Sequence, residues 1–161
     1  MLKMTVDGKQ AEAMFDGLLS GLEDLSPAWP QVERIVMDME REQFKTEGGY
    51  GGEKWEPLNK TYAEYKQMRY GNKPILQATG VLMGSLTTKG QGHYYASGPN
   101  FVEVGTTVPY GAYHQRGHES PTRLPKRTVV PVPNQDTGAK IADVILAFLL
   151  KKMRLKLTTG K

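Results

Sequence analysis

Two histidines in the sequence have a spacing that could bind a metal. They occur in His114-Gln-Arg-Gly-His118, and a separation of four residues places two histidines on one face of a helix, as in many zinc sites. Gly117 lies between them, however, and the acidic residue follows the second histidine, so the metalloprotease pattern H-E-x-x-H is absent. We therefore interpret His114 and His118 as surface or interface residues and keep a metal-dependent hydrolase as an alternative.

The chain has no other catalytic signature. None of its serines lies in a G-x-S-x-G nucleophile elbow. The glycine-rich stretch 48–52 matches neither the P-loop nor the dinucleotide fingerprint. The absence of cysteine excludes thiol catalysis, disulfides and cysteine-ligated zinc. We therefore expect no enzymatic activity, no cofactor and no metal.

Length and composition favour one globular domain that spans residues 1–161. The chain is 39% apolar and 24% charged, which is typical of a folded protein with a core of its own. No apolar run approaches the roughly 20 residues of a membrane span, and the N-terminus lacks the apolar segment of a signal peptide. We therefore expect a protein that has no membrane partner and acts inside the cell where it is made, or in an assembly built there.

Aromatic and basic residues are the remaining candidates for binding. The net charge of +4 permits an acidic partner or a nucleic acid without requiring either. Tyrosines alternate with cations in one segment, and further basic residues gather later: Tyr62, Tyr65, Lys66, Arg69 and Tyr70, then Arg116, Arg123, Lys126 and Arg127, and finally Lys151, Lys152, Arg154, Lys156 and Lys161. This pattern could follow a nucleic-acid backbone. It fits equally well the rim of a surface that docks an acidic partner.

Hydrophobic periodicity and capping signals predict helices over residues 10–24, 27–46, 60–69, 75–87 and 137–153, and a turn of helix from Pro109 that ends at Gly117. Strands are predicted near 2–6, 93–96, 101–104 and 128–132. Three helices have clear apolar faces, with Met14, Leu18, Leu19 and Leu22 in the first; Val32, Ile35, Val36, Met39 and Gln43 in the second, which leaves Glu33, Arg34, Asp38, Glu40 and Arg41 outside; and Ile141, Val144, Ile145, Phe148 and Leu149 in the last.

These elements predict an α+β fold. A small, mostly antiparallel sheet would contain the hairpin 93–104, the strand near 128–132 and residues 2–6, with the helix 27–46 and the C-terminal helix on one face. The loop 47–58 has four glycines around Tyr50, so we expect it to be mobile. Tyr50 and Trp55 would be exposed there, and such aromatic residues are enriched at interfaces.

Several short motifs follow one another in a specific order. They are Phe44-Lys-Thr-Glu-Gly-Gly, Trp55-Glu-Pro-Leu58, Thr61-Tyr62 with Lys66, Pro74-Ile-Leu-Gln-Ala-Thr-Gly80 with Leu82 and Ser85-Leu86, Val104-Gly-Thr-Thr-Val-Pro-Tyr110, Ala112-Tyr-His-Gln-Arg-Gly117 and Leu124-Pro-x-Arg127. In this order they resemble the phage virion-morphogenesis or tail-completion family, the group of the Mu G protein, over residues 32–150. One departure is visible, because that family tends to have Ala-Arg-Pro-Phe-Leu where this chain has Lys126-Arg127-Thr-Val-Val.

The resemblance implies a small α+β protein without catalytic activity, made in the cytoplasm of the host and located at the head–tail junction of a phage virion. Copies would form a neck ring, six-fold or a multiple of that, which closes the tail or joins it to the head. Neighbouring neck or tail proteins would be its partners, and contact with packaged DNA is possible.

Two groups of residues are the candidates for those contacts. The protein-interaction candidates are Tyr50, Trp55, Tyr62, Tyr110, His114, Arg123 and Arg127, and the candidates for electrostatic docking are Lys151, Lys152, Arg154 and Lys156. Two alternatives stay open. Trp55, Tyr110 and His114 could instead fix loops to the core, and the chain could be a nucleic-acid-binding module that uses its basic C-terminal helix.

Overall fold

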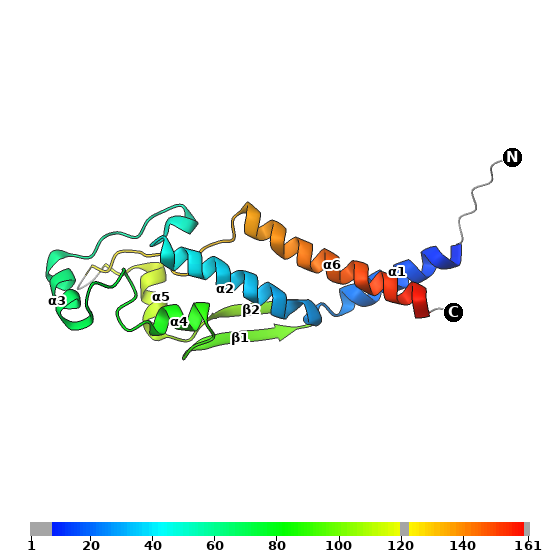
Figure 1. Cartoon of the computed structure of the whole chain (residues 1–161), viewed down its shortest axis with the longest axis horizontal. Helices are drawn as coiled ribbons and strands as arrows, with labels where there is room; N and C mark the ends of the chain where they lie inside the picture. The colour runs from blue at the N-terminus through cyan, green and yellow to red at the C-terminus, as the bar shows by residue number, and fades with distance from the viewer. Residues whose placement is uncertain (1–7, 120–122, 160–161) are drawn as a thin grey trace.

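The computed structural model describes residues 8–119 and 123–159 and shows an elongated molecule (Figure 1). In chain order its elements are α1 (Gly8–Glu23), the 3-10 turn η1 (Ser26–Ala28), α2 (Trp29–Lys45), the 3-10 turn η2 (Gly49–Gly51), α3 (Lys60–Tyr70), α4 (Val81–Thr87), β1 (His93–Gly98), β2 (Phe101–Thr106), α5 (Pro109–Arg116) and α6 (Gln135–Thr159). The predicted α+β class, with a small antiparallel sheet, is confirmed. Within the described residues, no helix is long and apolar enough to cross a lipid bilayer.

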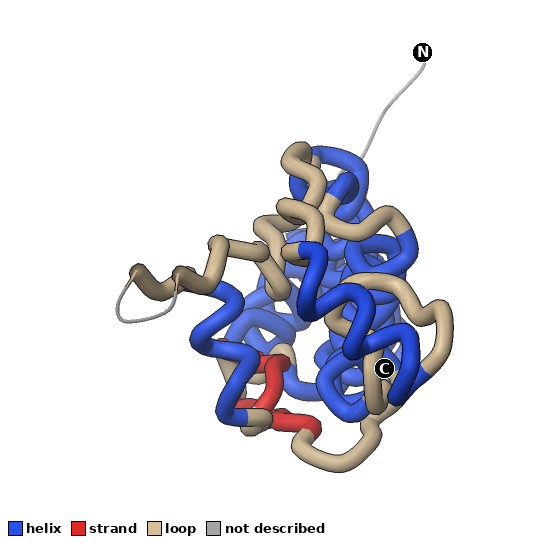
Figure 2. Tube along the Cα trace, turned by 90° about the vertical axis from the view of Figure 1, so that its left-hand side faces the viewer, coloured by secondary structure: helices blue, strands red, loops and turns tan. Residues whose placement is uncertain are grey.

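The two strands form an antiparallel hairpin at the edge of the helices (Figure 2). Helix α2 lies between this hairpin and α6, because one cluster joins Trp29 and Val32 of α2 to Val102 of β2 and Val144 of α6. The Trp29 indole also donates from Nε1 to the Gly98 carbonyl at the end of β1, over 2.7 Å. Helix α2 is therefore the middle layer of the molecule.

A second cluster lies farther along α2 and holds the loops that follow it. Its buried members are Phe44, Trp55, Leu82, Leu86, Val108 and Val129. The rings of Phe44 and Trp55 meet edge to face with their centroids 5.4 Å apart. Residues far apart in the sequence therefore share one core at the end of α2.

At the opposite end of the molecule, α1 and the last part of α6 lie side by side beyond the hairpin (Figure 1). We call this unit, α1 together with residues 146–159 of α6, the two-helix arm. Gly17 and Gly21 are buried against α6. A Cβ on Gly17 would come within 2.8 Å of the Met153 Cα, and one on Gly21 within 2.9 Å of the Leu149 side chain. Glycine therefore permits the close approach of the two helices.

This arrangement changes the expected role of the apolar face of α1. The helix forms as predicted, but Met14, Leu19 and Leu22 are exposed, together with Phe15. The face that packs against α6 carries the two glycines instead. The most apolar side of α1 is thus left on the surface.

The prediction that Glu33 and Glu40 lie on the outside of α2 is wrong, because both are buried. A helix between two layers buries two faces, and the second face of α2 carries Glu33, Met37, Glu40 and Phe44 at helical spacing. Glu33 pairs with His93 of β1, while Phe44 packs against α4. The acidic residues hide this second buried face from a search for apolar periodicity.

Three predicted elements differ from those observed. The helix predicted over 75–87 begins only at Val81, because Leu76 and Gly80 adopt positive φ angles of 60° and 77°. Residues 128–132 form no strand, since prolines 131 and 133 lack the N–H donor of a ladder. The last helix continues beyond 153 to Thr159. The strand predicted over residues 2–6 lies outside the described residues.

A side chain takes the place of a sheet partner along 128–132. Gln115 of α5 accepts from the backbone N–H of Val129 over 2.7 Å and of Val130 over 2.9 Å, and donates to the Val130 carbonyl over 3.1 Å. On the other side, Gln43 donates to the Thr128 carbonyl over 2.7 Å. These bonds satisfy the backbone of the segment without a strand, so the sheet of the described residues has two strands.

Candidate interaction surfaces

Trp55 is buried, so the prediction that it lies exposed in the loop is wrong. Its Nε1 donates to the Thr128 carbonyl over 2.9 Å, and its ring packs on Phe44. Gly48, at φ 98°, lies so close that an added Cβ would be 2.7 Å from the Trp55 ring. Trp55 therefore fixes the loop to the core, which is the structural alternative considered for it.

Tyr50 is half-buried and ties the same loop to the start of α6. Its hydroxyl donates to Thr137 Oγ1 over 2.7 Å and accepts from the Asn134 backbone N–H over 3.0 Å. Asn134 in turn accepts from the Thr137 N–H with its side chain, which satisfies a donor in the first turn of α6. The mobility expected for residues 47–58 stays a prediction, although these bonds anchor Tyr50.

Arg127 is also buried, and it clamps the chain that follows Trp55. Its guanidinium donates twice to the Glu56 carbonyl, over 3.0 and 2.8 Å, and once to the Pro57 carbonyl over 3.3 Å. Burial lowers the pKa of Arg127 from its usual value. Arg123, by contrast, is exposed and pairs with the Glu56 carboxylate over 3.1 Å. Arg123 is therefore available at the surface, whereas Arg127 organises the loop beneath it.

The two histidines do not lie on one helix, as a helical zinc site would require. Helix α5 ends at Arg116, since Gly117 takes a positive φ of 74°, and His118 lies beyond it in a bridge with Leu124. His114 is half-buried beside Tyr110, with ring centroids 6.4 Å apart. Burial, followed by the charge of Arg127, lowers the pKa of His114. Its Nδ1 is buried without a hydrogen-bond partner in the described structure. Among the described residues, no group of three or more potential ligands could hold a metal ion.

The exposed aromatic candidates lie on α3 and α5. Tyr62 is exposed with its ring 6.2 Å from that of Tyr65, and Met68 of the same helix is 85% exposed. Tyr110 is likewise exposed on α5, and so is its neighbour Tyr113. We call these five residues, four tyrosines and a methionine on two separate helices, the aromatic surface. Both helices lie away from the two-helix arm along the molecule (Figure 1).

Lys66 does not belong to a cationic surface on α3. It is buried, and its ammonium donates to the carbonyls of Lys73 and Pro74, the latter over 2.6 Å. Burial lowers its pKa. The alternation of tyrosines and cations in the sequence therefore includes one cation that closes a loop.

A buried ionic cluster on α2 was not anticipated from the sequence. Glu33 lies 3.0 Å from His93 Nε2 and 2.6 Å from the Lys89 ammonium. His93 Nδ1 lies 2.7 Å from the Ser85 carbonyl, so both ring nitrogens face acceptor oxygens. Burial raises the pKa of Glu33, but the hydrogen bonds from Lys89 and His93 outweigh that effect and hold it below its ordinary value. The cluster links α2 to β1 and the turn before it.

Glu40, two turns along the same face, is buried without such partners. Its Oε2 has no hydrogen-bond partner in the described structure. Burial raises the pKa of Glu40 to about 8. The carboxyl is therefore protonated near neutral pH in the folded chain.

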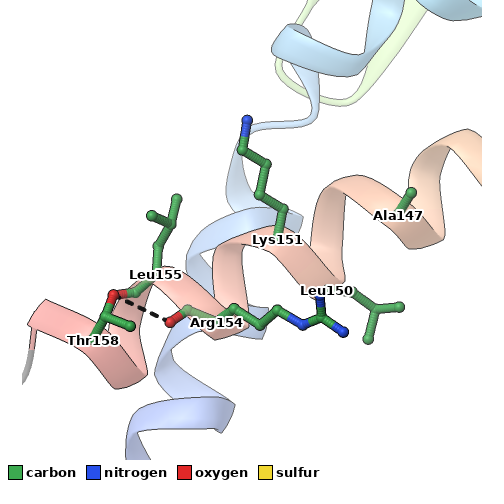
Figure 3. A pocket seen from close by; sticks show the side chains of 6 residues that line it. All are labelled: Ala147, Leu150, Lys151, Arg154, Leu155 and Thr158. Carbon is green, nitrogen blue, oxygen red and sulfur yellow. Dashed lines mark hydrogen bonds between the residues drawn. The ribbon is translucent and has the colours of Figure 1, made fainter.

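The basic residues of α6 divide between two sides of the helix. Lys151 and Arg154 line a shallow hollow with Ala147, Leu150, Leu155 and Thr158 (Figure 3). Lys152 turns toward the other side, where its ammonium lies 5.5 Å from the centroid of the Phe148 ring and its stem faces Gly21. Lys156 packs beside Gly17. The four cations therefore do not form one stripe.

Comparison with known proteins identifies the family. A model of the phage virion morphogenesis family matches residues 6–150, which confirms the resemblance of the ordered motifs. No curated protein and no solved structure gives a match. A family of this kind is structural and not catalytic, so the match indicates a virion-associated role in the assembly of phage particles.

Proposed function

We propose that this chain, which belongs to the phage virion morphogenesis family, is a structural protein of the head–tail junction. It would act in tail completion or in joining the tail to the head, as one subunit of a neck ring. The observation that supports this role is that large apolar side chains are exposed both on α3 and α5 and on the two-helix arm, which lie apart along an elongated chain. A subunit placed between neighbours needs more than one docking surface.

The aromatic surface suits a neighbouring neck or tail protein. Tyrosine and methionine are enriched in the centres of protein interfaces, and exposed aromatic rings supply contact area at a low cost in side-chain entropy. Tyr62 and Tyr110 are the members that the sequence also indicated. Arg123, with its charge at the surface, would contribute at the rim, where charges direct docking more than they add affinity.

The anchored residues would act indirectly. Trp55 and Arg127 hold residues 55–57 against residues 127–128, and Tyr50 fixes the loop to α6. This network positions Arg123, which pairs with Glu56. Loss of Trp55 or Arg127 would therefore disturb docking by loosening the loop, without either residue touching a partner.

A complementation experiment tests the proposed function. A phage or prophage in which this gene is interrupted should produce heads and tails that fail to join, or tails without a completed end, and a plasmid-borne copy should restore infectious particles. Tyr62→Ala combined with Tyr110→Ala should restore few particles, although the variant chain is folded. Normal yields of joined, infectious particles from the interrupted gene would contradict the proposal.

The alternative is a nucleic-acid-binding module. Lys151 and Arg154 lie exposed on the same side of α6, but Lys152 and Lys156 turn toward α1, which reduces the density of charge that a phosphate backbone would meet. Retention of the purified protein on duplex DNA across a salt series distinguishes the two functions. Binding that is strong, steeply salt-dependent and lost in a Lys151→Gln, Arg154→Gln variant would favour the alternative.

A further inference from the structure

The two-helix arm has an apolar surface on each of its helices. On α1 the large exposed residues are Phe15, Leu19 and Leu22, with Phe15 65% exposed. On α6 they are Leu146, Leu150 and Leu155. An arm that only packed its two helices together would not need either surface, because the contact between the helices is made by other residues.

The two surfaces face away from the contact between the helices. Successive residues of a helix are about 100° apart, so Leu19 lies about 200° from Gly17, which touches α6. On α6, Leu149 and Met153 meet α1, whereas Lys151 lies about 200° from both of them. Leu150 and Leu155 lie on the two flanks of this outer side, about 100° and 240° from Leu149. Figure 3 shows the residues that line the hollow along α6, with the α1 ribbon passing behind the helix. The apolar surfaces of α1 and α6 thus lie on different sides of the arm.

The charges beside the two surfaces have opposite signs. Helix α1 carries exposed Glu12, Asp16 and Glu23 and one basic residue, Lys9. Residues 146–159 of α6 carry Lys151, Lys152, Arg154 and Lys156 and no acidic residue. Of these, Lys151 and Arg154 flank the hollow itself. An acidic and apolar surface on one helix is therefore matched by a basic and apolar surface on the other.

We propose that the α1 surface of one copy docks onto the α6 surface of the next copy. Phe15, Leu19 and Leu22 would cover Leu150 and Leu155 of the neighbour, while Glu12, Asp16 and Glu23 would face Lys151 and Arg154. The two surfaces differ and lie on different sides of the arm. Each copy would therefore contact one neighbour through its α1 surface and a second neighbour through its α6 surface. Contacts of this heterologous kind close into a ring or continue as a filament. The inference rests on the proposed ring and supplies its subunit contact.

Two single substitutions test the contact in the full chain. Leu19→Lys places a cation opposite the basic surface, and Leu150→Glu places an anion opposite the acidic one. Sedimentation velocity over a concentration series should show self-association of the wild type and at least tenfold weaker association of each variant. An equimolar mixture of the two should associate again, because each variant supplies the surface that the other has lost.

Matched controls separate docking from general effects of charge. Val130→Lys and Val132→Glu, both before α6, introduce the same charges at residues that are 38% and 84% exposed and lie outside the arm and the aromatic surface, and both variants should associate like the wild type. Thermal unfolding followed by circular dichroism should give the same transition for all four variants. A variant with a lowered transition is replaced by Leu19→Ser or Leu150→Ser, for which the same outcomes are expected.

Four outcomes would overturn the inference. The first two are a wild-type chain that stays monomeric up to about 1 mM and a Leu150→Glu variant that associates like the wild type. The third is a mixture of Leu19→Lys and Leu150→Glu that stays monomeric. The fourth is a variant with Lys151 and Arg154 both changed to Glu that loses DNA retention but associates like the wild type. The proposed location at the head–tail junction is tested by complementation instead. A particle defect in the interrupted gene without any effect of Leu19→Lys would reject this contact and leave the location standing.

Discussion

Gly17 of α1 approaches Met153 of α6 so closely that a Cβ on Gly17 would lie 2.8 Å from the Met153 Cα. The contact is between backbones, so a larger side chain can be accommodated only if one helix moves. The spacing of the two-helix arm thus depends on a hydrogen atom at this position. The arm in turn sets the relative position of the two surfaces through which we propose that copies dock.

Gly17→Ala should therefore lower stability, while the same change at Gly138 should raise it. Gly138 lies in α6 with nothing within 4 Å of an added Cβ, so alanine there only improves helix propensity, by about 0.5–1 kcal/mol. At Gly17 the clash outweighs that gain, and overpacking costs about 1–3 kcal/mol. Urea unfolding of both variants measures the difference. Equal shifts of the two midpoints would show that the helices do not pack as closely as described.

Glu40 should make the chain less stable as the pH rises. Its pKa is about 8 in the folded chain against an ordinary 4.5, so the folded state holds a proton that the unfolded state has released. The contribution of Glu40 to the free energy of unfolding is fully present below about pH 4.5. Between about pH 4.5 and pH 8 it falls with a slope approaching about 1.4 kcal/mol per pH unit, and above about pH 8 it no longer changes. Chemical unfolding at several pH values should show this decline. Glu40→Gln should remove it, whereas Glu64→Gln on the surface of α3 should leave it in place.

Glu33 should act in the opposite direction, in acid. Its pKa is lowered in the folded chain, so its contribution is present above the ordinary value of 4.5 and is lost as the pH falls through the lower folded value. Glu33→Gln should therefore destabilise the chain at neutral pH, by about 1–3 kcal/mol, because Lys89 and His93 lose a charged acceptor. Unfolding at pH 7 and in acid would show a deficit that narrows as the pH falls. A constant deficit would mean that the Glu33 charge does not matter.

Trp55→Ala and Tyr62→Ala should separate support of the fold from docking. Truncation of the buried Trp55 should cost about 3–5 kcal/mol, enough to unfold much of a marginal domain. Truncation of the exposed Tyr62 should leave the free energy of unfolding within about 0.5 kcal/mol of the wild-type value while it lowers particle yield. A large loss of stability in Tyr62→Ala would place that ring in the core instead.

His114→Ala with His118→Ala should release no metal, as measured on the purified protein.

Local patterns predicted most helices and the hairpin, but not the surroundings of α2. Its apolar residues at helical spacing indicated a single buried face, and the helix has two. Glu33 is buried because Lys89 and His93, more than fifty residues later, satisfy it. Nothing near Glu33 in the sequence indicates those partners. Met37 and Phe44, spaced around Glu40 on the same face, were the available sign of a second buried face.

The candidate residues divide in a similar way. Their types indicated contact, yet aromatic and basic side chains are as well suited to fix a loop as to bind a partner. Trp55 and Arg127 find their acceptors across about seventy residues of sequence, so only the folded chain separates them from Tyr62 and Tyr110 at the surface. The apolar surface of α1 was recognised as a face, but its exposure depends on the glycines that occupy the side toward α6.

A reconstruction of the head–tail junction in intact particles tests the proposed role most directly. We predict several identical copies of this chain around the tail axis, six or a multiple of six, with α1 of each copy against the last part of α6 of the next. The aromatic surface of α3 and α5 should face a different protein of the neck or tail. A single asymmetric copy, or particles with no copy near the junction, would contradict the account.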